Sequence, residues 1–198
     1  WDRFGLYLIA IILIIIMSFG GYEFSKYLGY KNSESASDQY EKALAFLNDE
    51  NNSGAIDIFE SLVSESNGYS GLSLFNLSNI AIKEGKQVLA LEYLAKAAKD
   101  KNLSKKINDF AILKSGYIML DNAEIDNIED KLSSLLDSQD PFSFYAKEII
   151  ALAYYRDNRY QESSEKFNDI ANDASSPRNI ASRSKIFSEQ ISSYDNVK

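Results

Sequence analysis

Apolar residues fill the start of the chain almost without interruption. The run Phe4–Tyr22 holds 19 residues and no charge. As a helix rising ~1.5 Å per residue it would reach about 28 Å, close to the ~30 Å hydrocarbon core of a bilayer. Aromatic residues flank it, with Trp1 before the run and Tyr27 after it, as is typical of membrane interfaces. The pattern predicts a transmembrane helix, membrane-embedded through residues 4–22, within an anchor and juxtamembrane segment of residues 1–30.

Two other interpretations of this run remain open. A cleaved signal peptide would use Ser18 and Gly20 as small residues before the cleavage site. However, the run is longer than the ~7–15 residues of a signal-peptide core and no basic segment precedes it. A buried core helix is the second alternative. The chain starts at Trp1 rather than at a methionine, so we expect upstream residues to be missing, and the flanking charges alone do not decide the orientation.

The rest of the chain, residues 31–198, shows a repeated spacing of small and apolar residues. Four segments share steps of 3, 9, 4 and 3 residues, and successive segments are offset by 35, 38 and 35 residues. Their members are Ala43, Phe46, Ala55, Phe59 and Leu62; Ser78, Ala81, Ala90, Leu94 and Ala97; Gly116, Met119, Ile128, Leu132 and Leu135; and Ala151, Tyr154, Ser163, Phe167 and Ile170. Steps of 3 and 4 indicate amphipathic helices, and the nine-residue step crosses a turn.

This period predicts an all-α helical solenoid of about four degenerate helix pairs. One pair cannot bury its apolar face alone, whereas stacked pairs form a continuous core. Ile180, Ser184, Phe187 and Ile191 follow with helical spacing and predict a C-terminal capping helix, which such arrays need at their ends.

The helix pairs resemble the tetratricopeptide repeat family, whose unit is ~34 residues long. The fourth segment carries the resemblance best, through Ala151, Tyr154, Tyr160, Phe167 and Pro177. No tryptophan occupies the usual place, and Ser163 and Ile128 replace the small alanine. The resemblance implies a domain that binds other proteins.

The whole chain is similar to a family of single-span bacterial inner-membrane proteins, the ancillary subunit of the SecYEG translocon. The similarity rests on the apolar span, the Tyr-rich segment after it, the stretch Ser35–Ala43, and the block around Pro141 and Glu148. It implies a repeat domain in the periplasm and a scaffold that links the translocon to periplasmic chaperones or emerging chains. A regulator of cell-wall or division enzymes, or a homo-oligomeric structural protein, is the alternative.

In tetratricopeptide repeats the first helix of each pair lines the inner face. Carried onto this chain, the resemblance places a partner-binding groove at Tyr40, Leu44, Phe75, Asn79, Ile82, Leu113, Tyr117, Leu120, Tyr145, Glu148, Leu152, Tyr155 and Arg156. These residues are mainly apolar and aromatic, which suits a helix or an unfolded segment of a protein partner. The alternative is that the chain's own segments fill part of this groove, or that several of these residues belong to the core.

The amino-acid composition excludes several kinds of functional site. The 198 residues contain no cysteine and no histidine, which excludes disulfides, thiolate or imidazole metal sites and triads that need either side chain. The net charge is −8, and an acidic chain is a poor partner for nucleic acid. We therefore expect a protein that is not an enzyme, with no catalytic residues, cofactor, metal, nucleic acid or small-molecule substrate.

Charged residues form two groups in the sequence. Lysines cluster between the second and third pairs, at Lys96, Lys99, Lys101, Lys105 and Lys106. They could face lipid headgroups or an acidic partner, although a solvated surface is the commoner outcome. Asp137 and Asp140 are spaced so that they could share one helix face, as are Asp126, Glu129 and Asp130, but surface carboxylates at helical spacing are usually solubilising.

Overall fold

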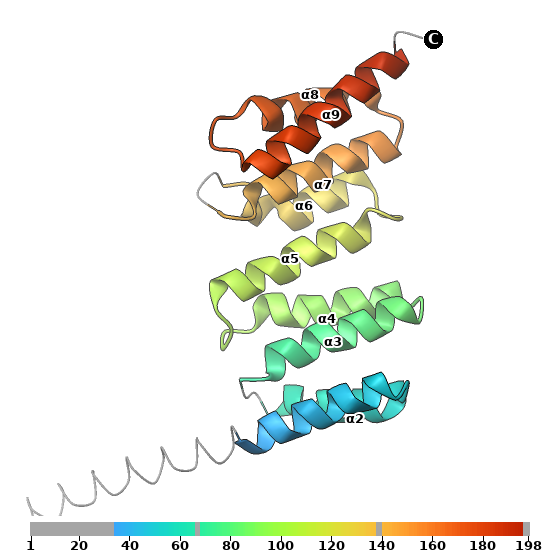
Figure 1. The fold of residues 1–198 in the computed structure, drawn as a ribbon, viewed down its shortest axis with the longest axis vertical. Coiled ribbons are helices and arrows are strands. Elements are labelled where there is room, and N and C mark those ends of the chain that lie inside the picture. The colour runs from blue at the N-terminus through green and yellow to red at the C-terminus, as the bar shows by residue number, and fades with distance from the viewer. Residues whose placement is uncertain (1–33, 66–67, 138–139, 196–198) are drawn as a thin grey trace, which may run out of the picture. The chain divides into compact units, whose positions relative to one another are not determined.

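The computed structural model describes residues 34–65, 68–137 and 140–195, and the regular elements among them are all helical (Figure 1). The elements in chain order are a helix of residues 34–48, α2 (Asn52–Ser64), α3 (Ser70–Lys83), α4 (Gln87–Lys99), α5 (Lys105–Met119), α6 (Ile125–Leu132), the short 3-10 helix η1 (Ser133–Leu135), α7 (Ser143–Arg156), α8 (Tyr160–Asn172) and α9 (Arg178–Asp195). The chain divides into two compact units. One ends at Ser73 and the other begins at Leu74, so the boundary falls inside α3. The predicted all-α fold is confirmed.

The predicted membrane span, residues 4–22, lies outside the described residues. Within the ranges that are described, no helix is both long enough and apolar enough to cross a membrane. The span remains a prediction.

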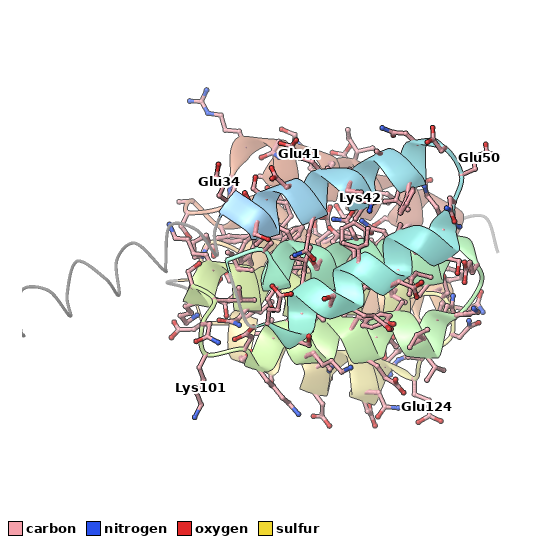
Figure 2. All side chains as sticks on the ribbon, turned by 90° about the horizontal axis from the view of Figure 1, so that it is seen from below. Glu34, Glu41, Lys42, Glu50, Lys101 and Glu124 are labelled. Carbon is pink, nitrogen blue, oxygen red and sulfur yellow. The ribbon has the colours of Figure 1, made fainter. Side chains whose placement is uncertain are left out.

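The helix of residues 34–48 and α2 form the core of the N-terminal unit. Ala43, Ala55, Phe59 and Leu62 are fully buried there. Gly54 allows the two helices to approach, because a Cβ atom at this position would lie 2.9 Å from the Phe46 ring. Figure 2 shows acidic side chains such as Glu34 and Glu41 on the exposed side of the first helix. The polar and apolar positions therefore separate as the helical spacing predicts.

Three of the turns inside helix pairs share one geometry. Glu50, Gly85 and Asn158 have φ angles of 58°, 72° and 61°. In each turn the next residue donates its N–H to a carbonyl five positions earlier, at 2.8–2.9 Å, as at Lys86 and Ala81. A left-handed residue with this hydrogen bond is a common way to end a helix. The third pair turns differently, and no residue of its turn has a positive φ angle.

The repeat positions form the interior of both units. Of the twenty aligned residues, all are buried except Phe46 and Met119, which are half-buried. Gly116 shows why small residues recur, since a Cβ atom there would lie 2.8 Å from a Leu132 methyl group. The predicted helix pairs and their register are confirmed.

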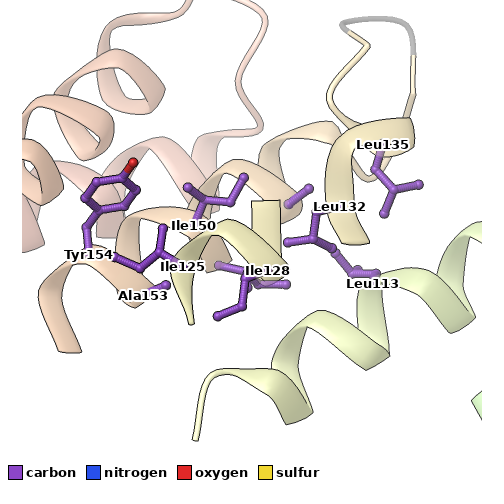
Figure 3. Packing of buried hydrophobic residues seen from close by; sticks show 10 residues of the cluster. Leu113, Ile125, Ile128, Leu132, Leu135, Ile150, Ala153 and Tyr154 are labelled. Atoms are coloured by element: carbon purple, nitrogen blue, oxygen red, sulfur yellow. The ribbon is translucent and has the colours of Figure 1, made fainter. Parts of the chain in front are cut away.

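Consecutive helices pack against each other through the C-terminal unit, from α4 to α9. One buried cluster joins α5, α6 and α7 through residues such as Leu113, Ile128, Leu132 and Tyr154 (Figure 3). A second joins α7, α8 and α9 through Phe144, Phe167, Ile180 and Ile191. Because α9 also contacts α7, it covers the last pair as the predicted capping helix does.

Candidate functional site

The first helices of the pairs, α3, α5 and α7, and the capping helix α9 meet along one side of the C-terminal unit. Contacts between them repeat the sequence period: Phe75 with Phe110, Asn79 with Lys114, and Glu148 with Arg183 are each 35 residues apart. We call the surface that carries these residues, with Tyr117, Leu152 and Tyr155, the A-helix face. Residues far apart in sequence are thus brought into one row.

A row of phenylalanine rings crosses the first helices of this face. The ring centroids of Phe75 and Phe110 are 5.4 Å apart, and those of Phe110 and Phe142 are 6.2 Å apart. Phe110 is nevertheless 45% exposed. A partly exposed aromatic row of this kind offers apolar contact area to a partner.

Lys114 lies next to this row on α5. Its ammonium group donates a hydrogen bond to the Asn79 side-chain oxygen on α3. Burial lowers the pKa of Lys114, because desolvation disfavours its charged form. Within the described ranges it has no carboxylate partner, so no ion pair compensates its charge.

Glu148 and Arg183 make the polar link between α7 and α9. The Nε and Nη2 nitrogens of Arg183 each donate to one oxygen of the Glu148 carboxylate, which is buried. This hydrogen bonding raises the pKa of Arg183. Tyr117 lies near the pair, and its pKa is raised first by burial and then by the negative charge of Glu148.

The A-helix face is hollowed where α7 meets α9. Tyr155, Phe187, Gln190, Ile191 and Ser193 line a cavity of about 370 Å³. The Tyr155 ring is 40% exposed and packs at 5.4 Å from Tyr160. A cavity with aromatic walls and two polar side chains can accept an apolar side chain of a ligand.

The structure separates the residues assigned to the groove into three groups. Phe75, Asn79, Ile82, Tyr117, Tyr145, Leu152 and Tyr155 are exposed or half-buried on α3, α5 and α7. Tyr40 and Leu44 are half-buried in the N-terminal unit, where the Tyr40 ring packs against Phe59 at 5.6 Å. The third group has structural contacts instead of a free surface and consists of Leu113, Leu120, Glu148 and Arg156.

Placing Leu113 on an exposed groove is wrong, because it is only 4% exposed and belongs to the core between α5, α6 and α7. Leu120 packs beside the same core. Arg156 donates to the carbonyls of Leu120 and Ala123, each at 2.7 Å, and so closes the turn of the third pair. Glu148 is buried in its pair with Arg183.

Sequence reasoning missed Lys114 and Arg183 as members of this face. The signal was available, because Lys114 is 35 residues after Asn79 and Arg183 is 35 residues after Glu148. A polar residue one period after another polar residue on a first helix predicts such a contact.

Some members of the lysine cluster and of the carboxylate pair have structural partners. Lys105 forms ion pairs with Asp109 at 2.6 Å and with Asp140 at 3.1 Å, and Lys96 lies over the Tyr93 ring. Asp140 also accepts the Phe142 N–H at 2.8 Å, which fixes the start of α7. Among the residues described, no group of three or more acidic side chains is arranged to hold a metal ion.

A larger cavity, of about 500 Å³, lies on other helices, between α6, α7 and α8. Leu136, Ile150 and Ile170 contribute apolar walls, with charged residues of both signs around them. None of the residues assigned to the groove lines it.

Comparison with known families agrees with this architecture. The family model described as a tetratricopeptide repeat-like domain matches residues 1–149. No curated protein matches the chain. The matched region includes the first three helix pairs and the start of α7. The chain therefore belongs to the tetratricopeptide repeat-like domain family.

Proposed function

We propose that this protein is an interaction scaffold that binds a segment of another protein along the A-helix face. Tetratricopeptide repeat-like domains are protein-interaction modules, and the chain belongs to that family. The observation that carries the proposal is the combination of the phenylalanine row, in which Phe110 is exposed, with the cavity at Tyr155 on the same face.

The proposal extends to place and partner. We propose that residues 4–22 anchor the chain in a bacterial inner membrane and that the repeat domain lies in the periplasm. The partners would be Sec translocon subunits, periplasmic chaperones or emerging chains. The length and apolarity of Phe4–Tyr22 and the similarity to the translocon ancillary family support these statements.

Site-specific photocrosslinking tests the binding face. p-Benzoylphenylalanine in place of Phe110, Tyr117 or Tyr155 should capture partner proteins from intact membranes. Val88 on α4 is the matched control, because it is 74% exposed but lies outside the A-helix face. Equal capture from Val88 would show that this face is not the binding surface.

The identity of the captured proteins tests the partner assignment separately. Translocon subunits or chaperones are expected. Cell-wall synthases without SecYEG would favour a regulator of envelope enzymes, and capture of this chain alone would favour a homo-oligomer.

Topology needs its own measurement. Protease added outside spheroplasts should digest the repeat domain from Tyr40 onward. Complete protection of the domain would contradict a periplasmic location.

A further inference from the structure

Charge is distributed unevenly between the helices that form the A-helix face and those that do not. The segments α3, α5, α7 and α9 contain nine basic and four acidic residues. The segments α4, α6 and α8 contain four basic and seven acidic residues. The helices that form the A-helix face are therefore richer in basic than in acidic residues, in a chain whose net charge is −8.

The contacts on the A-helix face show which charged side chains are free to pair with a ligand. Glu148 is buried, and Arg183 neutralises it through two hydrogen bonds. Lys114 is bound to a neutral amide, that of Asn79, and no carboxylate of the described residues lies within ion-pair distance of it. The centre of the face thus holds one uncompensated cation.

The surroundings of Lys114 make an opposite charge from a ligand favourable. It lies one turn after Phe110 on α5, and burial lowers its pKa. A half-buried ammonium without a counter-ion has lost part of its hydration and gained no ion pair in return. A carboxylate brought by a ligand would supply that ion pair.

The larger cavity between α6, α7 and α8 provides a contrast. Its charged walls carry Glu129, Asp130 and Asp169 together with Lys147 and Lys166, and Lys166 already lies 3.9 Å from Glu129. Charges of both signs line this larger cavity. It therefore shows no preference for a ligand of one charge.

Building on the proposed function, we propose that the A-helix face selects protein segments that combine acidic with aromatic or aliphatic side chains. A carboxylate of the segment pairs with Lys114. Its apolar side chains pack on Phe75 and Phe110 and enter the cavity beside Tyr155. The net charge of the chain predicts the opposite preference, for basic segments, because long-range attraction follows net charge. The two expectations can be separated by experiment.

The test uses two synthetic peptides of about 16 residues with phenylalanine and leucine at helical spacing, one carrying glutamates and the other lysines at the remaining positions. Fluorescence anisotropy measures the Kd of each for the full 198-residue chain in neutral detergent. We expect the glutamate peptide to bind at least about tenfold more tightly, with an advantage that shrinks as salt is raised.

Single substitutions test whether the preference for the glutamate peptide arises from the A-helix face. Lys114→Gln removes the charge but keeps a donor for Asn79, and it should weaken the glutamate peptide about fivefold while leaving the lysine peptide unchanged or tighter. Lys101→Ala is the matched control, since Lys101 is exposed on a turn and extends away from the helices in Figure 2. Phe110→Ala should weaken both peptides. Circular dichroism checks that each variant is folded.

Three results would overturn this inference. They are tighter binding of the lysine peptide, binding of neither peptide, and equal effects of Lys114→Gln and Lys101→Ala. Tighter binding of the lysine peptide that is lost in Phe110→Ala would still support the proposed function. Binding of neither peptide, together with partner capture from Tyr117, would also leave the proposed function supported. Failure of the charge preference can therefore be distinguished from failure of the proposed function.

Discussion

Arg183 on α9 binds the carboxylate of Glu148 on α7 through two of its nitrogens, and the two residues are 35 positions apart. The Glu148 side chain is 5% exposed, whereas that of Arg183 is 40% exposed. The guanidinium also lies 5.9 Å from the Tyr145 ring centroid. This link attaches the capping helix to the last pair and leaves no charge of Glu148 unpaired on the A-helix face.

Removing Arg183 should loosen the capping helix. Arg183→Ala leaves a buried carboxylate without its partner, and because the arginine is partly exposed we expect a loss of about 2 kcal/mol in the free energy of unfolding. Urea denaturation followed by circular dichroism measures it. Lys185→Ala is the control, because Lys185 is 71% exposed and lies 3.9 Å from Glu189. Equal stability of the two variants would show that the pair does not hold α9.

Gly116 should resist substitution because α5 and α6 approach closely there. A Cβ atom would lie 2.8 Å from a methyl group of Leu132, which is itself fully buried. Gly116→Ala should therefore lower the unfolding free energy by about 1 kcal/mol, since overpacking of ~2 kcal/mol exceeds the helix-propensity gain of ~1 kcal/mol. Gly68→Ala, with no atom within 4 Å of the added carbon, should be neutral in the same denaturation assay.

Substitutions at two turns inside the helix pairs should change the stability in opposite directions. Gly85 and Glu50 both have left-handed φ angles, which cost a residue with a side chain about 1 kcal/mol. Gly85→Ala should destabilise the chain by about that amount. Glu50→Gly should stabilise it slightly, because the added chain entropy of glycine offsets part of the gain. Melting temperatures that fall in both variants would contradict this account of the turns.

Asp140 should make stability depend on acid pH. Burial alone would raise its pKa, but the Phe142 N–H and Lys105 together outweigh burial and lower the pKa below the ordinary value of 3.8. A depressed carboxyl pKa contributes stability that is present above the unfolded pKa and is lost as pH falls through the folded pKa. Asp140→Asn should therefore be less stable at pH 7 and show a shallower loss of stability below about pH 4. Denaturation curves at several pH values measure this, with Asp57→Asn on α2 as the control. If the loss of stability at low pH is the same in Asp140→Asn as in the unmodified protein, Asp140 is not its source.

The helix pairs could be predicted from the sequence because their interior depends on local spacing. Ala43, Ala90, Ile128 and Phe167 are fully buried, and each was assigned to the interior by the repeated steps alone. Small residues such as Gly116 mark close helix approaches, which any stacked arrangement of these pairs needs. The period therefore determined the helices, their order and most of the core.

The surface face was harder to predict because it depends on neighbours in other pairs. Leu113 and Tyr117 are one turn apart on α5 and both match the pattern of an inner face, yet only Tyr117 is exposed. The packing of α6 and α7 against Leu113 decides this difference, and helical spacing within α5 contains no information about it. Arg156 likewise matched the face but is used to bind two carbonyls of the preceding turn.

Composition and the spacing within single helices are enough to predict an all-helical repeat, a capping helix and an acidic chain without cysteine or histidine. That Arg183 neutralises Glu148, while Lys114 one turn after Phe110 keeps an uncompensated charge, becomes visible only once the helices are packed together. The physical reason is that ion pairing and desolvation depend on distances between helices, and those distances are set by how successive pairs pack.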